Sequence, residues 1–195
     1  MNHDEKLDLR IDKQLFEELT RNAEKMNRIP LELYQKYSVK RGLRNEDGSG
    51  VLVGLTEIGD VHGYIVDEGE LLPVEGRLLY RGIQIEDLVA GFRKDGRLGF
   101  EEIYYLLLFG ELPLRQQLEQ FCAVLAENRA LPDGFTENMI LKNPSHDIMN
   151  KLARSVLVSY SYDPNPDDIS VRNVLRQSIE LIARFPTMAA YGYQA

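Results

Sequence analysis

Residues 100–113, Phe-Glu-Glu-Ile-Tyr-Tyr-Leu-Leu-Leu-Phe-Gly-Glu-Leu-Pro, decide the fold class of this sequence. They predict a helix that begins at Phe100, a turn at Gly110, and a second helix with Pro113 at its first position, where the missing N–H of proline costs nothing. Apolar residues then fall on one face of that second helix: Leu114, Leu118, Phe121, Cys122 and Leu125. Since the pattern is helical from Ile85 onward, we expect a mainly α, multi-helical fold.

Before residue 85 the sequence is rich in β-forming residues. Three short runs favour strands: residues 51–53, 61–66 and 71–74. Turn signals at 67–69 and 74–76 separate these runs, and Pro73 restricts its strand to an edge or a bulge. We therefore expect a small β-meander near residues 51–81.

The last third of the sequence carries start and stop signals for further helices. Ser145 is expected to cap a helix that begins near Ile148, and Asn165 with Pro166 is expected to open another helix, which Pro186 ends. Thr187 could cap one more helix. The sequence stops at Ala195, two turns into that apolar segment, so we expect a chain that is cut rather than finished.

The first 50 residues differ from the rest in composition and in the spacing of apolar residues. Leu15, Phe16 and Leu19 recur at helical spacing, and residues 31–37 form a second apolar segment, which together predict two amphipathic helices. Residues 42–50 have the composition of a flexible linker. We therefore divide the chain into a helical N-terminal arm with its linker, residues 1–50, and a larger domain, residues 51–195.

The composition excludes several classes of protein. The chain has 195 residues, of which 44% are hydrophobic, and this is enough for a sizeable core. Its net charge of −8 argues against a nucleic-acid partner. It contains no apolar run near the roughly 20 residues that span a bilayer and no secretory signal, so we expect a cytoplasmic protein without a membrane partner. A single cysteine, Cys122, excludes an internal disulfide and a Cys-based zinc site.

The histidines and hydroxyl groups do not form a recognisable active site. His3, His62 and His146 are scattered, so no two of them share a helix face as a metal site requires. Ser145-His146-Asp147 has the residue types of a catalytic triad, but a triad is assembled across a fold and not from sequence neighbours. Helix capping explains Ser145 and Asp147 more simply.

Other motifs also have structural explanations. Residues 163–168 imitate the start of a calcium loop, but Asp168 stands where the loop needs glycine. Residues 48–54 are too long for a dinucleotide fingerprint and precede a strand. Cys122 lies on an apolar helix face, and Glu101 and Glu102 point in different directions. From the residues alone we assign no catalytic, substrate-binding, cofactor-binding or metal-binding residue, and no cofactor.

An ordered series of motifs nevertheless resembles the N-terminal part of the citrate synthase large domain. After an opening Gly54-Leu55-Thr56-Glu57-Ile58, residues 76–88 (GRLLYRGIQIEDL) resemble the family pattern LxYRGYxIEDL. Residues 100–113 resemble FEEVAYLLLxGELP, and residues 181–191 (LIARFPTMAAY) resemble LIAKLPTIVAY. The family's frequent His-Pro-Met is replaced here by His146-Asp147-Ile148-Met149. The resemblance covers about 140 residues and implies a bacterial-type enzyme of this family.

The resemblance implies condensation of acetyl-CoA with oxaloacetate to citrate and CoA by a homodimer. In the family a carboxylate removes a proton from the acetyl methyl group, two histidines stabilise the enol and polarise the keto carbonyl, and arginines bind the oxaloacetate carboxylates. These residues belong to the later half of the family's sequence, beyond residue 195. We therefore expect the parent protein to be an acyltransferase of the tricarboxylic acid cycle and this chain alone to be inactive. Arg81 is expected to be structural.

Two alternatives remain open at this stage. A 2-methylcitrate synthase, which uses propionyl-CoA, differs in an acyl pocket that this half does not contain. A free-standing helical protein of this descent, retained only for binding or regulation, should have a capped and polar C-terminus.

Overall fold

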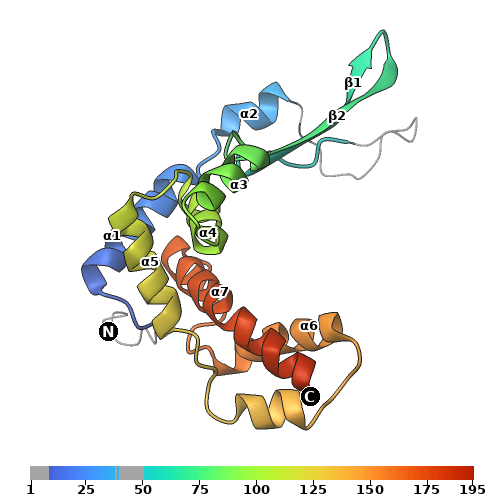
Figure 1. Cartoon of the computed structure of the whole chain (residues 1–195). Helices are drawn as coiled ribbons and strands as arrows, with labels where there is room; N and C mark the ends of the chain where they lie inside the picture. The colour runs from blue at the N-terminus through green and yellow to red at the C-terminus, as the bar shows by residue number, and fades with distance from the viewer. Residues whose placement is uncertain (1–8, 38, 40–50) are drawn as a thin grey trace. The chain divides into compact units, whose positions relative to one another are not determined.

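The computed structural model describes residues 9–37, 39 and 51–195, so the predicted linker at 42–50 and His3 both lie outside the described residues. The chain divides into two compact units. The first unit combines Met1–Arg21 with Arg115–Ala195, and the second unit is Asn22–Leu114. Figure 1 shows their elements, and the mainly α fold is confirmed. The division into an arm of 1–50 and a domain of 51–195 stays a prediction.

In the second unit an antiparallel hairpin precedes two helices. Strand β1 (Gly59–Asp67) pairs with β2 (Glu70–Tyr80), and β2 pairs at its end with the short β3 (Ile83–Gln84). Helix α3 (Ile85–Lys94) follows β3 directly, and α4 (Phe100–Phe109) comes next. The sequence predicts the short helix α2 (Leu31–Lys36), and the structure places it in this unit.

The sheet differs from the predicted meander in two details. Residues 51–53 form no strand. The predicted turn at 67–69 is confirmed, but β2 continues through residues 74–76, where a second turn was expected. The pairing shifts there from His62 opposite Arg77 to Tyr64 opposite Pro73. Gly76 and Pro73 thus mark an irregularity in a long hairpin, because proline cannot continue a regular ladder.

Helix α4 begins at Phe100 and ends at Gly110 as predicted. Tyr105, Leu106 and Phe109 are buried, and Gly110 has a φ of 82°, a left-handed conformation that suits glycine at a helix end. A Cβ at Gly110 would lie 2.6 Å from the methyl carbon of Met26, so α1 also requires glycine there. The predicted start at Pro113 was wrong, because α5 begins at Arg115.

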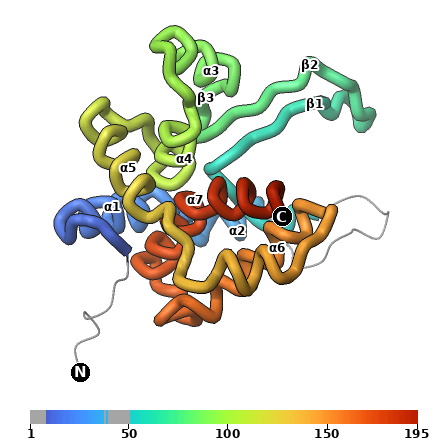
Figure 2. Tube along the Cα trace, turned by 60° about the horizontal axis from the view of Figure 1, so that its bottom comes forward, coloured from blue at the N-terminus to red at the C-terminus, as the bar shows by residue number. Residues whose placement is uncertain are grey.

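The first unit is a set of packed helices. It contains α5 (Arg115–Glu127), a π-helical turn η1 (Thr136–Leu141), α6 (Ile148–Ser159), a 3₁₀ turn η2 (Tyr160–Tyr162) and α7 (Val171–Gln194). Figure 2 shows α6 and α7 side by side. A cluster of Phe135, Ile140 and Met188 joins η1 to α7. Leu175 and Ile179 of α7 are also buried.

Three predicted helix limits in this unit were wrong. Asp147, not Ser145, caps α6 by accepting a hydrogen bond from the Asn150 backbone N–H at 3.0 Å. Helix α7 begins after Ser170, so residues 165–168 form a loop before it. Helix α7 also continues through Pro186 and Thr187, because Ala183 and Met188 are buried on either side and their packing outweighs the one hydrogen bond that proline removes.

The N-terminal helix α1 (Lys13–Met26) contributes to the core. Phe16 is 1% exposed, and Arg172 of α7 lies over its ring at 4.9 Å. Asn128 accepts from the Arg10 backbone N–H and donates to the Arg10 carbonyl, both at 3.0 Å. Residues 9–21 therefore belong structurally to the first unit. None of the described helices has the length and apolar character needed to cross a membrane.

Candidate functional site

The most concentrated set of charged side chains in the described residues surrounds Arg176 on α7. Its guanidinium is 1% exposed and donates three hydrogen bonds. The acceptors are Asp163 Oδ1 at 2.5 Å, Glu180 Oε1 at 2.9 Å and Asn173 Oδ1 at 2.9 Å. Because a buried charge is costly unless it is paired and hydrogen-bonded, this arrangement fixes all the groups involved.

The spacing along α7 positions most of this network. Asn173, Arg176, Glu180 and Arg184 follow one another at helical intervals of three and four residues, so they share one face. Arg184 donates to Glu180 Oε2 at 2.9 Å, which places Glu180 between two arginines. Asp163 comes from the loop after η2 and also accepts from Gln177 at 2.9 Å. The loop is held by Asn173, which donates to the carbonyls of Asn165 and Asp168 at 2.8 Å each.

A cavity of about 200 Å³ opens beside this network. Its walls include Tyr160, Tyr162, Asp163, Gln177, Glu180 and Arg184. A second cavity of about 410 Å³ shares Tyr162, Glu180 and Arg184. The Nε–H of Arg184 is buried without an acceptor.

The electrostatics do not favour acid–base chemistry at this position. Burial alone would raise the pKa of Asp163, but hydrogen bonds from the Asn165 backbone N–H, Gln177 and Arg176 outweigh it and hold that pKa below its usual 3.8. A carboxylate with a lowered pKa is a weak base at neutral pH. The first cavity is lined by Asp163, Glu180 and Arg184, so its walls carry no surplus positive charge for an anionic ligand.

Arg81 occupies a structural position in the second unit. Its Nη2 donates to the Leu107 carbonyl at 2.8 Å and to Asn27 Oδ1 at 3.0 Å, and its Nη1 donates to the Met26 carbonyl at 3.5 Å. Its backbone φ is +49°, an uncommon conformation for a residue other than glycine. Burial lowers the pKa of Arg81, while the charge of Glu57 opposes that shift. The side chain therefore joins the ends of α1 and α4, in agreement with the structural role that the sequence predicts.

The structure does not bring the described histidines together. His62 lies exposed on β1, with Nε2 at 2.8 Å from Asp60, and His146 is exposed in the loop before α6. The two residues belong to different units. Ser145 Oγ accepts from the Asp147 backbone N–H at 3.1 Å, which is a local turn contact. The geometry of Ser145-His146-Asp147 is therefore that of a helix start.

The residues of the apparent calcium loop have protein partners. Asp167 accepts from the Tyr160 hydroxyl, at 3.0 and 2.9 Å, and Asp168 accepts from the Ser170 backbone N–H at 2.9 Å. Asp163 belongs to the Arg176 network. Among the described residues no group of three or more His, Cys, Asp or Glu is placed to hold a metal ion.

Two other candidate residues, Glu102 and Cys122, lie outside the Arg176 network. Glu102 pairs with Arg97 at 2.5 Å, and Cys122 is half-buried on α5. The Arg176 network was not predicted from the sequence. The repeat Arg176, Glu180, Arg184 at intervals of four was the available signal, since such pairs lie on one helix face.

Comparison with known proteins identifies the class. A family model described as "Citrate synthase, C-terminal domain" matches residues 47–195. The chain therefore belongs to the citrate synthase family.

Individual relatives agree with this result. The chain is 31% identical to 2-methylcitrate synthase 1 of Corynebacterium glutamicum over 153 residues, which are 78% of this chain and 34% of that protein. It is 32% identical to the citrate synthase of Haloferax volcanii over 140 residues, 68% of this chain and 35% of that protein. The chain thus spans about a third of the length of the curated relatives that it matches.

Solved structures resemble the chain as well. The citrate synthase of Pyrobaculum aerophilum matches with a TM-score of 0.57 and 26% identity, over 77% of this chain and 37% of that one. A citrate synthase from Thermoplasma acidophilum, solved with carboxymethyl coenzyme A and oxaloacetate, matches in fold with a TM-score of 0.58 and 20% identity. That match covers 73% of this chain and 33% of the other.

Proposed function

We propose that this chain is the N-terminal part of the large domain of a citrate synthase, whose complete form condenses acetyl-CoA with oxaloacetate to give citrate and CoA. The observation that carries this proposal is the continuous family match over residues 47–195. The parent is an acyltransferase that works in the cytoplasm, as a homodimer, in the tricarboxylic acid cycle. It needs no additional cofactor, membrane or nucleic acid.

In this proposal the 195 residues supply the scaffold and not the chemistry. The carboxylate, histidines and arginines that the family resemblance assigns to the reaction lie beyond residue 195. The arginines with the most acceptors in the described residues, Arg81 and Arg176, are committed to carbonyls and carboxylates. The exposed His62 and His146 lie on different units. The chain by itself therefore performs no condensation.

The test measures thiol release from acetyl-CoA in the presence of oxaloacetate. The purified 195-residue chain is compared with the product of the same reading frame extended past Ala195. We expect turnover from the extended protein alone. Turnover by the pure 195-residue chain would contradict the scaffold role, and a folded extended protein without turnover would contradict the citrate synthase assignment. A stop codon directly after Ala195 would instead favour a binding or regulatory protein.

A second candidate activity is the condensation of propionyl-CoA with oxaloacetate. The relative from Corynebacterium glutamicum named 2-methylcitrate synthase 1 supports it. The same assay discriminates the two activities when acetyl-CoA and propionyl-CoA are compared at equal concentration. A higher kcat/KM with propionyl-CoA would assign the parent to 2-methylcitrate formation, because the ratio of kcat/KM values defines specificity.

A further inference from the structure

Lys151 is a buried cation without a counter-charge in the part of the chain that the structure describes. It lies in the first turn of α6 and is 5% exposed. Within the described residues its Nζ makes one hydrogen bond, to the Gly192 carbonyl of α7 at 2.7 Å. An ammonium group has three N–H donors, so two remain available. Because a buried charge is costly unless it is paired, this position favours an anion beside Lys151.

A cavity of about 360 Å³ opens beside this lysine, and both Lys151 and its acceptor Gly192 line it. The other walls come from the loop before α6, the start of α6 and the end of α7: Pro144, Ser145, His146, Ile148, Tyr193 and Ala195. No aspartate or glutamate side chain is among these lining residues, whereas carboxylates line both cavities beside Arg176. This cavity, within the first unit, therefore differs from those two in offering a cation that no wall carboxylate neutralises.

The start of α6 adds hydrogen-bond donors at the same place. The backbone N–H groups of Ile148 and Met149 have no acceptor among the described residues, as is usual in the first turn of a helix. Ser145 Oγ accepts from the Asp147 backbone N–H at 3.1 Å, and its own O–H has no acceptor in the described residues. The exposed ring of His146 has no hydrogen-bond partner there either. Since the helix dipole is positive at this end, these donors together favour an anion.

Two carboxylates lie close to this cavity along the chain, and neither forms an ion pair with Lys151. Asp147 caps α6 by accepting from the Asn150 backbone N–H at 3.0 Å, and it does not line the cavity. In the 195-residue chain Ala195 carries the terminal carboxylate at the cavity wall. That group becomes a neutral peptide carbonyl when the chain is extended. Extension past Ala195 should therefore strengthen the binding of an anion, because it removes a like charge.

We propose that this cavity binds a phosphate group, with Lys151, Ser145, His146 and the first amides of α6 as its donors. Lysine is a common phosphate ligand, and helix N-termini bind phosphate through their unpaired amides. A tetrahedral oxyanion accepts from several donors at once, which a single carboxylate does less well. The walls from Pro144 and Ile148 are apolar, so the cavity also has a surface for the organic part of a phosphate monoester. The proposal is independent of the condensation reaction, because it rests on described residues of the first unit alone.

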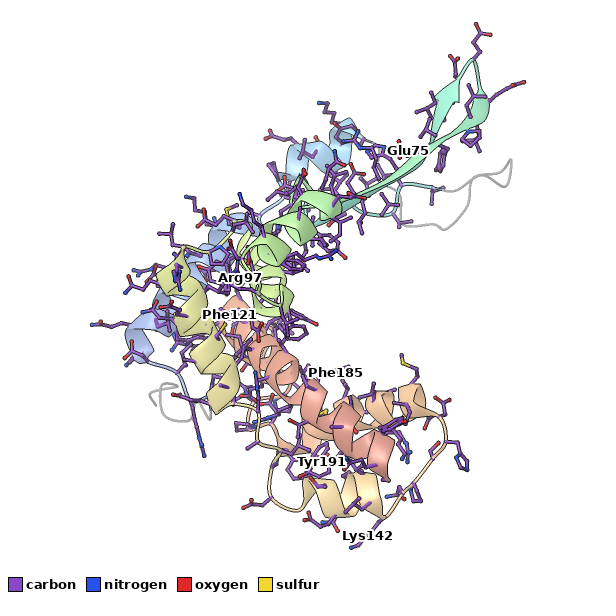
Figure 3. All side chains as sticks on the ribbon, in the orientation of Figure 1. Glu75, Arg97, Phe121, Lys142, Phe185 and Tyr191 are labelled. Atoms are coloured by element: carbon purple, nitrogen blue, oxygen red, sulfur yellow. The ribbon has the colours of Figure 1, made fainter. Side chains whose placement is uncertain are left out.

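Isothermal titration calorimetry with inorganic phosphate tests the site in the full 195-residue chain. We expect saturable binding by the wild type. Lys151→Met should raise the Kd by about tenfold or more, because a charge-assisted hydrogen bond is lost. The matched control is Lys142→Met, which makes the same change in net charge and should leave the Kd unchanged. Lys142 is exposed and also donates to one neutral oxygen, Asn138 Oδ1 at 2.8 Å, and Figure 3 shows it on the outside of this unit at the end of η1.

Two further measurements do not depend on a substitution at the buried lysine. The double variant Ser145→Ala/His146→Gln changes only the loop before α6 and should raise the phosphate Kd by about threefold or more, since two neutral donors are lost. It decides the result if Lys151→Met does not fold, as judged by circular dichroism. In the wild type, phosphate should slow hydrogen exchange at the amides of Ile148 and Met149, measured by NMR. The Asn150 amide, which already donates to Asp147, should not change.

A comparison of ligands identifies the source of the phosphate group. Tighter binding of phenyl phosphate than of inorganic phosphate assigns the site to a monoester, and equal binding assigns it to free phosphate. The product of the reading frame extended past Ala195 should bind phosphate at least as tightly as the 195-residue chain. The proposal is overturned by a lack of saturable binding to either protein, by wild-type affinity in folded Lys151→Met or in the double variant, or by an equal loss of affinity in Lys142→Met.

Discussion

Replacing Arg176 with methionine should destabilise the protein strongly. The guanidinium is 1% exposed and neutralises Asp163 and Glu180, whose side chains are 11% and 10% exposed. Removing one partner of a buried ion pair costs about 3–5 kcal/mol. Glu180 keeps Arg184, and Asp163 keeps Gln177 and the Asn165 backbone N–H, so we expect a loss near the lower limit, about 3 kcal/mol in the free energy of unfolding.

Urea unfolding followed by circular dichroism measures this loss. An unchanged m-value shows that the variant exposes the same amount of surface on unfolding as the wild type does. The matched control is Arg115→Met, because Arg115 is 93% exposed and its bridge to Glu119 has the same i,i+4 spacing. Exposed pairs of this kind contribute roughly 0–1 kcal/mol. If Arg176→Met costs no more than Arg115→Met, the network does not stabilise the fold and the reasoning fails.

The pH dependence provides a second measurement on the same variant. The pKa of Asp163 is held below 3.8 in the folded state, so its contribution to stability is present above that pH and is lost as the pH falls through the folded-state pKa. In Arg176→Met the pKa of Asp163 rises, because a cation that favours the carboxylate is gone. The difference in unfolding free energy between the two proteins should therefore narrow below about pH 4. A difference that stays constant from pH 7 to pH 3 would contradict the assignment of the loss to buried carboxylates.

Two further predictions concern the second unit. Arg81→Met removes the donors to the Leu107 and Met26 carbonyls and to Asn27. It should lower the free energy of unfolding by about 2 kcal/mol in the same urea assay. A change below about 0.5 kcal/mol, typical of an ordinary surface substitution, would show that these hydrogen bonds do not stabilise the fold. Glu68→Asn should stabilise the turn, because Glu68 and Gly69 have φ values of 46° and 86°, the left-handed pair that favours Asn-Gly. Hydrogen exchange at the amides of Ile65 and Val66 should then slow by roughly threefold, corresponding to a gain of about 0.6 kcal/mol, whereas faster exchange would show that the glutamate side chain stabilises the hairpin.

The sequence was most informative where local geometry alone decides the structure. Helix α4 begins at Phe100 and ends at Gly110 as predicted, because a left-handed helix end requires a residue without Cβ. The turn at 67–69 followed from its glycine for a similar reason. The ordered motifs that resemble citrate synthase also identified the family, which the match over residues 47–195 confirms.

Local signals failed where packing competes with them. Pro186 was expected to end a helix, but α7 continues because Ala183 and Met188 are buried on both sides. Asn165 and Pro166 have the composition of a helix start, yet Asn173 holds their loop outside α7 through two hydrogen bonds. Ser145 and Asp147 are both capping residues by type, and only the backbone geometry shows that Asp147 makes the cap.

The sequence by itself determined the family, the helical class and the positions of most helices, since these depend on motifs, periodicity and conformational preferences that act within a few residues. Only the tertiary structure decided which charges are buried together. Asp163 and Arg176 are separated by a loop and a helical turn, and their 2.5 Å contact depends on how that loop folds back on α7. The exposure of both faces of the hairpin is likewise a tertiary property, because the apolar pattern of a strand does not say whether another layer covers it.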